Sequence, residues 1–592
     1  MRDIEAAIPA KPKVAFFRWT REGLPPFIQD HILQQELVLR QIFDLTVLAN
    51  DCDYDEVCDV VRPELAIFES GVYAGHRSLA NIDTHPEVLK LGFLHADAFD
   101  TSRAAYLSDM ERWGIGWTFT TSMSMPEYLP DIADRLFVWP NFIDGQVFRD
   151  YGEEKVATVL LAGGRASHYP WRNAVAEVVS SALPTVTLPH HGWQDSPETR
   201  RMSSGEAYAR AMNASLFVPT CGSISRDVVR KHVEIPGSMS CLVTERTPTV
   251  EAFGFEDNVN CVFATDESVV DRLKYLCDRP DELERIVSAG YELVHTYHTM
   301  ANRDQPLQWL RLVRAHGPDI DVVQDWPDGR LRLAQSQVER GSHVPAQGVD
   351  RELITIGWDL QRAGRLADAD RVLSRVLEMF LIPEAAVALA HVRMREGDVQ
   401  SALSWVRRVL IATLGHRESP APDPVVWAYE VRGLLCEGDI AGAAAALDRF
   451  PHLAHIQIDR IRVALDAMSG VTSAPGETIV MTPSVAPLPF STFDNWVREL
   501  DESLAKNRVG ATLLDGKGVQ LRGRMPRSSA VSAGVSEWRA RRATRRLDMR
   551  LRNWRAGRDR GPVRHWIRVR LSKSRYALRG IKTSLSLWRN WR

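Results

Sequence analysis

The sequence predicts two α/β domains with parallel sheets, followed by an α-helical repeat domain and a basic tail. Three features of the chain predict this order. Up to about residue 330, short apolar runs alternate with amphipathic helical stretches, a pattern typical of parallel α/β sheets. Between residues 350 and 470 the strand patterns stop, and glycine-centred motifs recur at near-constant spacing. Residues 521–592 hold 22 Lys and Arg against three acidic residues, a local charge of +19.

The composition fits a globular protein of several domains. With 592 residues and about 150 residues per domain, we expect two to four domains. Apolar residues make up 45% and charged residues 25%, which excludes a fully disordered chain, a fibrous repeat and a small disulfide scaffold. No stretch reaches the roughly 20 apolar residues of a membrane-spanning helix, and residues 1–10 lack a signal-peptide pattern. The seven cysteines show no Cys-x-x-Cys pattern, so we expect reduced thiols and a cytoplasmic protein.

Residues 1–148 form the first predicted domain. Amphipathic helices are expected at residues 32–42 and near residues 104–113. Ligands bind at the carboxyl ends of parallel strands, so we expect functional residues in the loops that follow these strands. The predicted strands are Lys13–Phe17, Asp44–Ala49, Leu65–Phe68, Leu91–His95 and Trp117–Thr120.

Residues 149–330 form the second predicted domain, again with alternating strands and helices. Its first strand, Val156–Ala162, runs into Gly163-Gly164-Arg165, a turn that we expect to lead into the helix Trp171–Ala182. A helix is also expected at Ser225–Val233. The other predicted strands are Thr185–Leu188, Ser215–Pro219, Cys241–Thr244 and Cys261–Ala264.

Residues 350–470 are predicted to form helical hairpins. A glycine followed by a small residue five positions later occurs at Gly364, Gly397 and Gly438, 33 and 41 residues apart. This spacing is similar to that of tetratricopeptide-type repeats, in which a glycine turn joins two helices. An ordinary helical bundle is the alternative. We expect the helical domain to bind a protein partner or an acceptor.

The remainder of the chain is predicted to contain a linker and a tail that binds a polyanion. Residues 471–520 begin with a stretch rich in Pro, Ser and Thr, typical of a linker. In residues 521–592 tryptophans alternate with arginines, as in helices that lie on anionic membrane surfaces. Nucleic-acid binding and a solvated tail are the alternatives. The tryptophans are Trp538, Trp554, Trp566, Trp588 and Trp591.

Several motifs together resemble one enzyme family. Residues 234–245 read Glu-Ile-Pro-Gly-Ser-Met-Ser-Cys-Leu-Val-Thr-Glu, and residues 289–303 contain Ala-Gly, His-Thr and a final Arg. Residues 91–98 and 141–144 agree with the same pattern. Over about residues 13–315 the chain resembles GT-B glycosyltransferases of the group 1 type, most closely the spore-maturation CgeB-like branch. The resemblance implies two Rossmann-like domains and a hexosyltransferase that uses a nucleotide-sugar donor.

The resemblance also implies roles for individual residues. It places Glu234 on the ribose hydroxyls of the donor, and His95, at the end of a strand, beside the transferred sugar. His95 and Asp97 are therefore the candidate catalytic residues, with a strand-capping role as the alternative for His95. Arg226 stands where many retaining members carry a second glutamate, and Met239 stands where glycine is usual. The donor sugar, the acceptor and the stereochemical course stay open.

The donor's diphosphate needs positive charge and backbone N–H groups. Charge builds on the leaving diphosphate as the glycosidic bond breaks, and cations or helix starts can stabilise it. We therefore expect no metal or other cofactor, since Arg and Lys side chains and a helix start can stabilise the diphosphate without a divalent ion. The adjacent His190 and His191 suit a loop better than a metal site. The candidate nucleotide-sugar residues are Gly163, Gly164, Arg165, Arg172, Arg230, Lys231 and Glu234.

The competing prediction is a binding protein rather than an enzyme. In this alternative the two α/β domains are a catalytically degenerate pair, and the repeats and the tail mediate binding at a membrane or to nucleic acid. Nucleotide-sugar turnover separates the two predictions.

Overall fold

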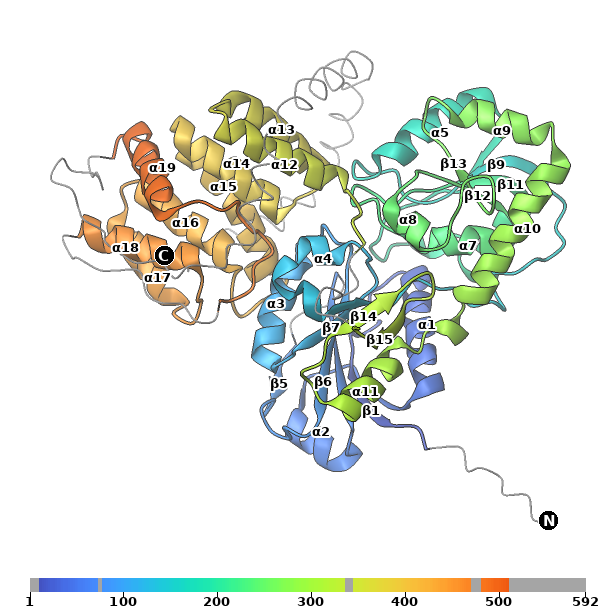
Figure 1. Ribbon diagram of the computed structural model, residues 1–592, viewed down its shortest axis with the longest axis horizontal. Coiled ribbons are helices and arrows are strands. Elements are labelled where there is room, and N and C mark those ends of the chain that lie inside the picture. The colour runs from blue at the N-terminus through green and yellow to red at the C-terminus, as the bar shows by residue number, and fades with distance from the viewer. Residues whose placement is uncertain (1–9, 73–76, 336–343, 470–480, 510–592) are drawn as a thin grey trace.

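The computed structural model describes residues 10–72, 77–335, 344–469 and 481–509. These residues form three domains, two α/β domains and one all-helical domain (Figure 1). The predicted basic tail, residues 521–592, lies outside the described residues, as do parts of the predicted linker.

The first domain is built on a six-stranded parallel sheet of order β2-β1-β4-β6-β7-β8. Both faces of the sheet are covered, so its strands are continuous apolar runs with fully buried side chains such as Ala15 and Phe68. All five predicted strands are confirmed. The sheet strands are β1 (Lys13–Phe17), β2 (Asp44–Leu48), β4 (Leu65–Gly71), β6 (Leu89–His95), β7 (Trp117–Thr120) and β8 (Leu136–Val138). The other elements are α1 (Pro26–Ile42), β3 (Cys52–Asp53), α2 (Tyr54–Val61), β5 (Leu79–Ala80), α3 (Ser102–Trp113), α4 (Met125–Tyr128) and the 3-10 helix Pro130–Arg135.

The second domain has a five-stranded parallel sheet of order β10-β9-β11-β12-β13. Its strands are β9 (Ala157–Leu161), β10 (Thr185–Thr187), β11 (Ser215–Pro219), β12 (Cys241–Thr244) and β13 (Val262–Phe263). Its helices are α5 (Pro170–Ala182), α6 (Gly205–Asn213), α7 (Lys231–Gly237), α8 (Pro248–Ala252), α9 (Val269–Cys277) and α10 (Pro280–Tyr297), with 3-10 helices at Thr199–Arg201 and Met300–Asn302.

The helix predicted at Ser225–Val233 is wrong. Residues 222–230 form a loop, and the helix α7 begins only at Lys231. Ser223 and Arg226 have φ angles of 64° and 54°, which a right-handed helix does not allow. The buried carboxylate of Asp227 turns away from a helical path to accept hydrogen bonds from the first domain, including one from the Ser124 N–H at 3.0 Å. Tertiary contacts therefore override the local apolar pattern.

After the second domain the chain crosses back to the first. The segment contains α11 (Gln305–His316), β14 (Val322–Asp325) and β15 (Arg330–Leu333), which lie over the first domain in Figure 1. Leu307, Trp309 and Leu310 share a core with first-domain strand residues. The predicted boundary at residue 330 therefore differs from the structure, because the apolar face of α11 is buried by the first sheet.

A buried arginine, Arg303, fixes the point where the chain crosses back to the first domain. It is the final residue of the motif at residues 289–303. Arg303 Nε donates to the Pro140 carbonyl at 2.8 Å, and its Nη2 donates to the Asn141 carbonyl at 2.7 Å. His298 accepts from the same guanidinium at 3.1 Å. The His-Thr and Arg of this motif thus fasten the two connections between the α/β domains.

The helical domain consists of antiparallel hairpins. The three predicted glycine turns are confirmed: Gly364, Gly397 and Gly438 have φ angles of 72°, 89° and 79°, in the left-handed region that glycine adopts without a steric penalty. Its helices are α12 (Val349–Arg362), α13 (Leu366–Met379), α14 (Pro383–Glu396), α15 (Val399–Leu410), α16 (Pro424–Cys436), α17 (Ile440–Arg449), α18 (Ile456–Met468) and α19 (Phe493–Lys506), with a π-helix at Ile411–His416.

The predicted linker, residues 471–520, contains part of this domain. The helix α19 buries Trp496, Leu500 and Leu504, spaced four residues apart, against the helical core. Asp423, at the start of α16, accepts hydrogen bonds from the Ser484 hydroxyl at 3.0 Å and the Val485 N–H at 2.7 Å. Residues 481–509 therefore belong to the helical domain, and the linker prediction is wrong for them.

The helical domain is fixed to both α/β domains. Glu384 of α14 forms a buried ion pair with Arg103 of α3, with an Nη2–Oε2 distance of 2.9 Å. The Tyr128 hydroxyl donates to Asp350 at 2.7 Å, again between the first domain and the helical domain. On the second domain, the Ser167 hydroxyl donates to the Met379 carbonyl at 2.9 Å. The three domains thus surround a common space.

Candidate functional site

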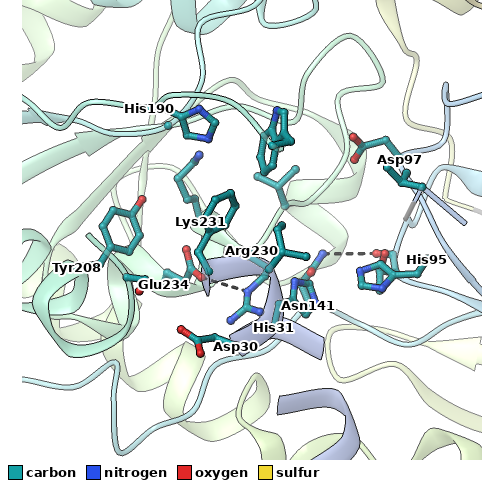
Figure 2. Close-up of a pocket in the computed structure, with 18 of the residues that line it drawn as sticks. Asp30, His31, His95, Asp97, Asn141, His190, Tyr208, Arg230, Lys231 and Glu234 are labelled. Carbon is teal, nitrogen blue, oxygen red and sulfur yellow. Dashed lines mark hydrogen bonds and ion pairs between the residues drawn. The ribbon is translucent and has the colours of Figure 1, made fainter. Parts of the chain in front are cut away.

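A cavity of about 690 Å³ lies between the domains. Residues from all three domains line it, and Figure 2 shows the polar side chains that face each other across it. Seven of the nine predicted site residues line the cavity: His95, Asp97, Gly163, Arg172, Arg230, Lys231 and Glu234. Gly164 and Arg165 do not line it, and Arg165 is exposed.

On the second-domain side of the cavity, the Lys231 amine packs closely against Gly163. Gly163 follows β9 with a φ of +95°, and a β-carbon on it would lie 2.1 Å from Lys231 Nζ. Only glycine therefore lets the amine approach the backbone of this turn. No hydrogen bond or ion pair joins Lys231 Nζ to any residue within the described ranges. Its charge is available to a ligand.

The cavity lowers the pKa of Lys231 to about 7. Burial is the largest cause, because it penalises the ammonium form, and the nearby Arg172 guanidinium adds to the effect. Glu234 opposes the shift. A lysine in this state gains a proton when an anion binds beside it.

Arg172, on α5, holds the loop that carries Gly163. Its guanidinium donates to the Gly164 carbonyl at 2.8 Å and to the Cys221 carbonyl at 3.2 Å, and it lies 4.1 Å from the centre of the Tyr169 ring. No carboxylate pairs with Arg172 among the residues that the structure describes. Arg172, which is buried, and Lys231, which is half-buried, therefore share one corner of the cavity without an ion-paired carboxylate, and we call these two residues the cationic corner.

Glu234 lies in the first turn of α7 and is 9% exposed. Arg230 Nε donates to Glu234 Oε1 at 3.1 Å, and Arg230 Nη2 donates to the Gln34 side chain of α1 at 2.7 Å. Arg230 thus joins the carboxylate to the first domain across the cleft, as Figure 2 shows for its contact with Glu234. Glu234 Oε2 forms no hydrogen bond with a described residue.

His95 stands at the end of β6 on the opposite wall. Trp19 stacks on its ring with a centroid distance of 5.0 Å, and the His31 ring lies 4.9 Å away. Its Nδ1 is buried and lies 3.5 Å from Oε1 of Glu69, which lies two residues before the end of the neighbouring strand β4. A proton shared between His95 Nδ1 and Glu69 Oε1 would give each of these buried atoms a hydrogen-bond partner. Glu69 therefore orients the ring, and the sequence prediction did not include it.

Asp97 faces the cavity two residues after His95. Its carboxyl group is open to the cavity but enclosed by the cavity walls, and this loss of bulk water is the largest cause that raises its pKa to about 7. The charges of Asp100 and Asp227 add to the shift. A carboxyl group with a pKa near 7 can exchange a proton at neutral pH, which suits general acid–base chemistry.

Asp227 ties the two α/β domains together at the bottom of the cleft. Ser122 donates a short hydrogen bond to its carboxylate, and the Ser124 hydroxyl donates at 2.7 Å. The Met123 N–H adds a third contact at 3.1 Å. Asp227 has its partners within the protein, so it acts as a structural residue although it lines the cavity.

Several cavity residues escaped the sequence prediction. His190 lies beside Lys231 in Figure 2, and its pKa falls to about 4, chiefly through burial and then through the charges of Lys231 and Arg172. Trp193 packs on His190 at 4.8 Å. Both follow the end of β10, so the strand-end rule applied to this strand would have found them. The others include Asp30 and His31 of α1, Asn141 and Tyr208.

The described part of the chain contains neither a membrane-spanning helix nor a group of metal ligands. No helix in it is long and apolar enough to cross a membrane. No three His, Cys, Asp or Glu side chains in it are grouped so that they could hold a metal ion.

The chain is similar in fold to several solved structures at low identity. The Anabaena HepE protein, solved with UDP and glucose, is 9% identical, with a TM-score of 0.35 over 51% of this chain and 100% of HepE. Sucrose-phosphate synthase from Thermosynechococcus elongatus is 8% identical, with a TM-score of 0.39 over 52% of this chain and 99% of the synthase. The pneumococcal O-GlcNAc transferase GtfA, solved with UDP and GlcNAc, is 11% identical, with a TM-score of 0.29 over 42% and 56%.

No curated protein matches the chain. A family match covers the part of the second domain that carries the cationic corner and Glu234. Residues 168–308 match the family described as "Glycosyl transferase-like", so this part of the chain is similar to that family.

Proposed function

We propose that the protein is a GT-B glycosyltransferase of the CgeB-like type that moves a hexose from a nucleoside diphosphate sugar to an acceptor hydroxyl. The observation that carries this proposal is the cationic corner of Lys231 and Arg172 against Gly163, with both cations inside the segment that matches the glycosyl transferase-like family. Two cations without an anion suit a diphosphate and make a divalent metal unnecessary. Glu234, with one free carboxylate oxygen, suits the ribose hydroxyls.

The proposed reaction breaks the bond between the sugar C1 and the diphosphate oxygen. The nucleoside diphosphate leaves with the electron pair, and the charge on its oxygen is stabilised by Lys231 and Arg172. The acceptor oxygen forms the new bond to C1, and its proton passes to Asp97, whose pKa of about 7 fits a base at neutral pH. His95, oriented by Glu69, contacts the sugar from the first domain.

The helical hairpins suit a second binding surface. We propose that they are tetratricopeptide-like repeats that bind a protein or glycan acceptor, or a protein partner. Their glycine turns and their antiparallel pairing support the proposal. Their contacts with both α/β domains, Glu384 with Arg103 and Ser167 with Met379, support an acceptor bound close to the cleft.

A thermal-shift screen against UDP-, GDP- and dTDP-sugars tests the donor proposal. A donor at about 100 times its dissociation constant stabilises the protein by about 2.7 kcal/mol, so one of the three series should raise the melting temperature. The alternative is a binding-only scaffold, which the ion pair between Arg226 and Glu245 favours, because Arg226 replaces a family glutamate and keeps Glu245 occupied. A shift without donor turnover would support the scaffold, and no shift in any series would contradict the donor proposal.

Donor affinity should fall as the pH rises through 7. The ammonium form of Lys231 binds the diphosphate, and its pKa of about 7 makes it mostly charged at pH 6 and mostly neutral at pH 8. Binding of a nucleoside diphosphate sugar should therefore weaken by about tenfold between these pH values. Nucleotide sugars are the right probe, because their diphosphate has no proton to lose in this range.

Lys231→Met is the control for this pH dependence. The variant should bind the donor weakly and with a flat profile from pH 6 to pH 8, measured by calorimetry. A flat profile in the unaltered chain would contradict the role of Lys231.

The basic tail should attach the enzyme to anionic membranes. Residues 521–592 carry a charge of +19 with interspersed tryptophans, and each basic residue near an anionic surface contributes about 1 kcal/mol. Truncation after Val509 keeps α19 and should release the protein from phosphatidylserine vesicles while donor turnover is preserved. High salt should weaken vesicle binding of the full chain without abolishing it, because salt does not screen apolar burial.

Vesicle sedimentation distinguishes the possible partners of the tail. Retention of the truncated chain on anionic vesicles, or equal binding of the full chain to neutral vesicles, would contradict an electrostatic anchor. Stronger retention on nucleic acid than on anionic vesicles would favour the alternative partner.

A further inference from the structure

One corner of the cavity is made of three rings, each from a different domain. Phe99 belongs to the first domain, His168 to the second and Phe380 to the helical domain, and all three line the cavity. The ring centroids of Phe99 and Phe380 are 4.8 Å apart, and those of His168 and Phe380 are 5.5 Å apart. Phe99 and His168 are separated by 5.7 Å. We call these three residues the aromatic corner.

The helical domain fixes the position of Phe380. The preceding residue, Met379, accepts the hydrogen bond from Ser167, next to His168. Four residues after Phe380, Glu384 forms the buried ion pair with Arg103, which lies four residues after Phe99. Phe380 is therefore held from both sides, although it lies in the turn between α13 and α14. It is half-buried and keeps part of its ring open to the cavity.

The aromatic corner lies on the acceptor side of the cavity. Phe99 is two residues from Asp97, the proposed base, and Figure 2 shows Asp97 on the opposite side of the cavity from Glu234 and Tyr208. The proposed donor contacts, Glu234 and Lys231, come from the second domain. An acceptor that gives its hydroxyl proton to Asp97 therefore lies next to the aromatic corner, in which Phe380 and His168 are half-buried and Phe99 is buried.

The charge and polarity of the aromatic corner favour one class of acceptor. Burial, followed by the charge of Arg172, lowers the pKa of His168 to about 4, so its ring is neutral at pH 7. On the first-domain side, Asp97 and Asp100 flank Phe99 in the sequence and also line the cavity, so their carboxylates repel a phosphate or a carboxylate on an acceptor. Aromatic rings offer an apolar surface, and a pyranose presents a complementary face of C–H groups.

We infer that Phe380 is a specificity-determining residue of the acceptor subsite, and that this subsite takes the pyranose ring of a neutral glycan. This inference rests on the proposed function. The helical domain then has a direct role in the reaction, because it supplies one wall of the subsite in addition to any binding surface of its own.

The test compares transfer with hydrolysis in the full-length chain. UDP-, GDP- and dTDP-glucose serve as donors, and methyl glucoside, p-nitrophenyl glucoside and glucose 6-phosphate serve as acceptor probes. The unaltered protein should transfer to the two neutral glucosides and not to glucose 6-phosphate. Phe380→Ala should lower transfer to the glucosides about tenfold, while donor hydrolysis and nucleotide affinity stay within about twofold.

Two further variants separate ring contact from folding. Phe380→Trp keeps an aromatic face and should retain most of the transfer. Phe490→Ala changes another phenylalanine that follows the helical repeats, 88% exposed and far from the cavity lining, and should have no effect. The melting temperatures of all variants show whether the fold is intact.

Each outcome supports or overturns the inference. A selective loss of transfer in Phe380→Ala, restored in Phe380→Trp, supports it. An equal loss of hydrolysis and transfer places Phe380 in the donor site and overturns it, as does transfer to glucose 6-phosphate or the absence of transfer to either neutral glucoside. Failure of the unaltered chain to bind any nucleotide overturns the proposed function itself, and the inference with it.

Discussion

Glu384→Ala should destabilise the protein by about 3–5 kcal/mol, because it leaves the buried Arg103 without its carboxylate and leaves Arg351 only its pair with Asp350. Glu384 accepts from Arg103 Nη2 at 2.9 Å and pairs with Arg351 Nη1 at 2.8 Å, and the Arg103 side chain has no exposed surface. Burial alone would raise the pKa of Glu384, but the two arginines outweigh burial and lower the pKa. The carboxylate is therefore ionised at neutral pH and compensates both cations.

The melting temperature measures this loss. For a domain the size of the helical one, 3–5 kcal/mol corresponds to a decrease of roughly 10 °C. Glu378→Ala is the matched control, since this glutamate of α13 pairs with Arg375 at 2.8 Å on the surface, where such pairs contribute about 1 kcal/mol or less. Equal melting temperatures for Glu384→Ala and Glu378→Ala would show that the buried pair does not hold the domains together.

The sequence predicted those elements whose cause is local. The strands of the first domain are apolar runs buried on both faces, so their pattern alone defines them, as Lys13–Phe17 and Trp117–Thr120 show. The turns at Gly364 and Gly397 were predictable because a left-handed backbone favours glycine. Their positions required no knowledge of the partner helices.

The elements that the sequence missed have a distant cause. Residues 225–230 read as a helix, yet Asp227 is drawn to the hydroxyls of Ser122 and Ser124, about 100 positions away in the chain. The segment that holds α19 starts in a Pro- and Ser-rich stretch, and only its packing on α14 shows that it belongs to the helical domain. Such contacts leave no signal in a local window.

The candidate site shows the same difference between residues predictable from local sequence and residues brought together only by the fold. Lys231 and Glu234 could be named because they belong to a motif, and Asp97 because it follows a strand end. Phe380 belongs to no predicted motif and lies 146 positions after Glu234, the nearest predicted site residue in the sequence, so only the folded chain brings it to the cavity. Arg165 shows the opposite error, since it stands in the predicted glycine turn but points to solvent.

Glu234→Ala should weaken donor binding by tens-fold while the fold stays intact. The carboxylate accepts a hydrogen bond from Arg230 Nε, and the loss of a charge-assisted pair to the ribose hydroxyls costs about 2–3 kcal/mol. The measurement belongs at pH 6, because Glu234 helps to keep Lys231 protonated and its removal would otherwise weaken binding through the lysine. At pH 6 the lysine holds its proton more fully than at pH 7, so less of the loss comes from the lysine and more of it reports the carboxylate itself.

Glu251→Ala is the matched control for Glu234→Ala. Glu251 lies in the same domain, pairs with Arg246 at 2.7 Å on the surface and does not line the cavity, so its removal should leave donor affinity unchanged. Glu234→Gln keeps the size of the side chain and should still lose most of the affinity, because an amide offers only one acceptor oxygen and no charge. Calorimetry with the donor found in the screen gives each dissociation constant. If Glu234→Ala binds the donor as tightly as Glu251→Ala, the ribose of the donor does not contact Glu234, and the nucleotide must bind the cationic corner in another orientation.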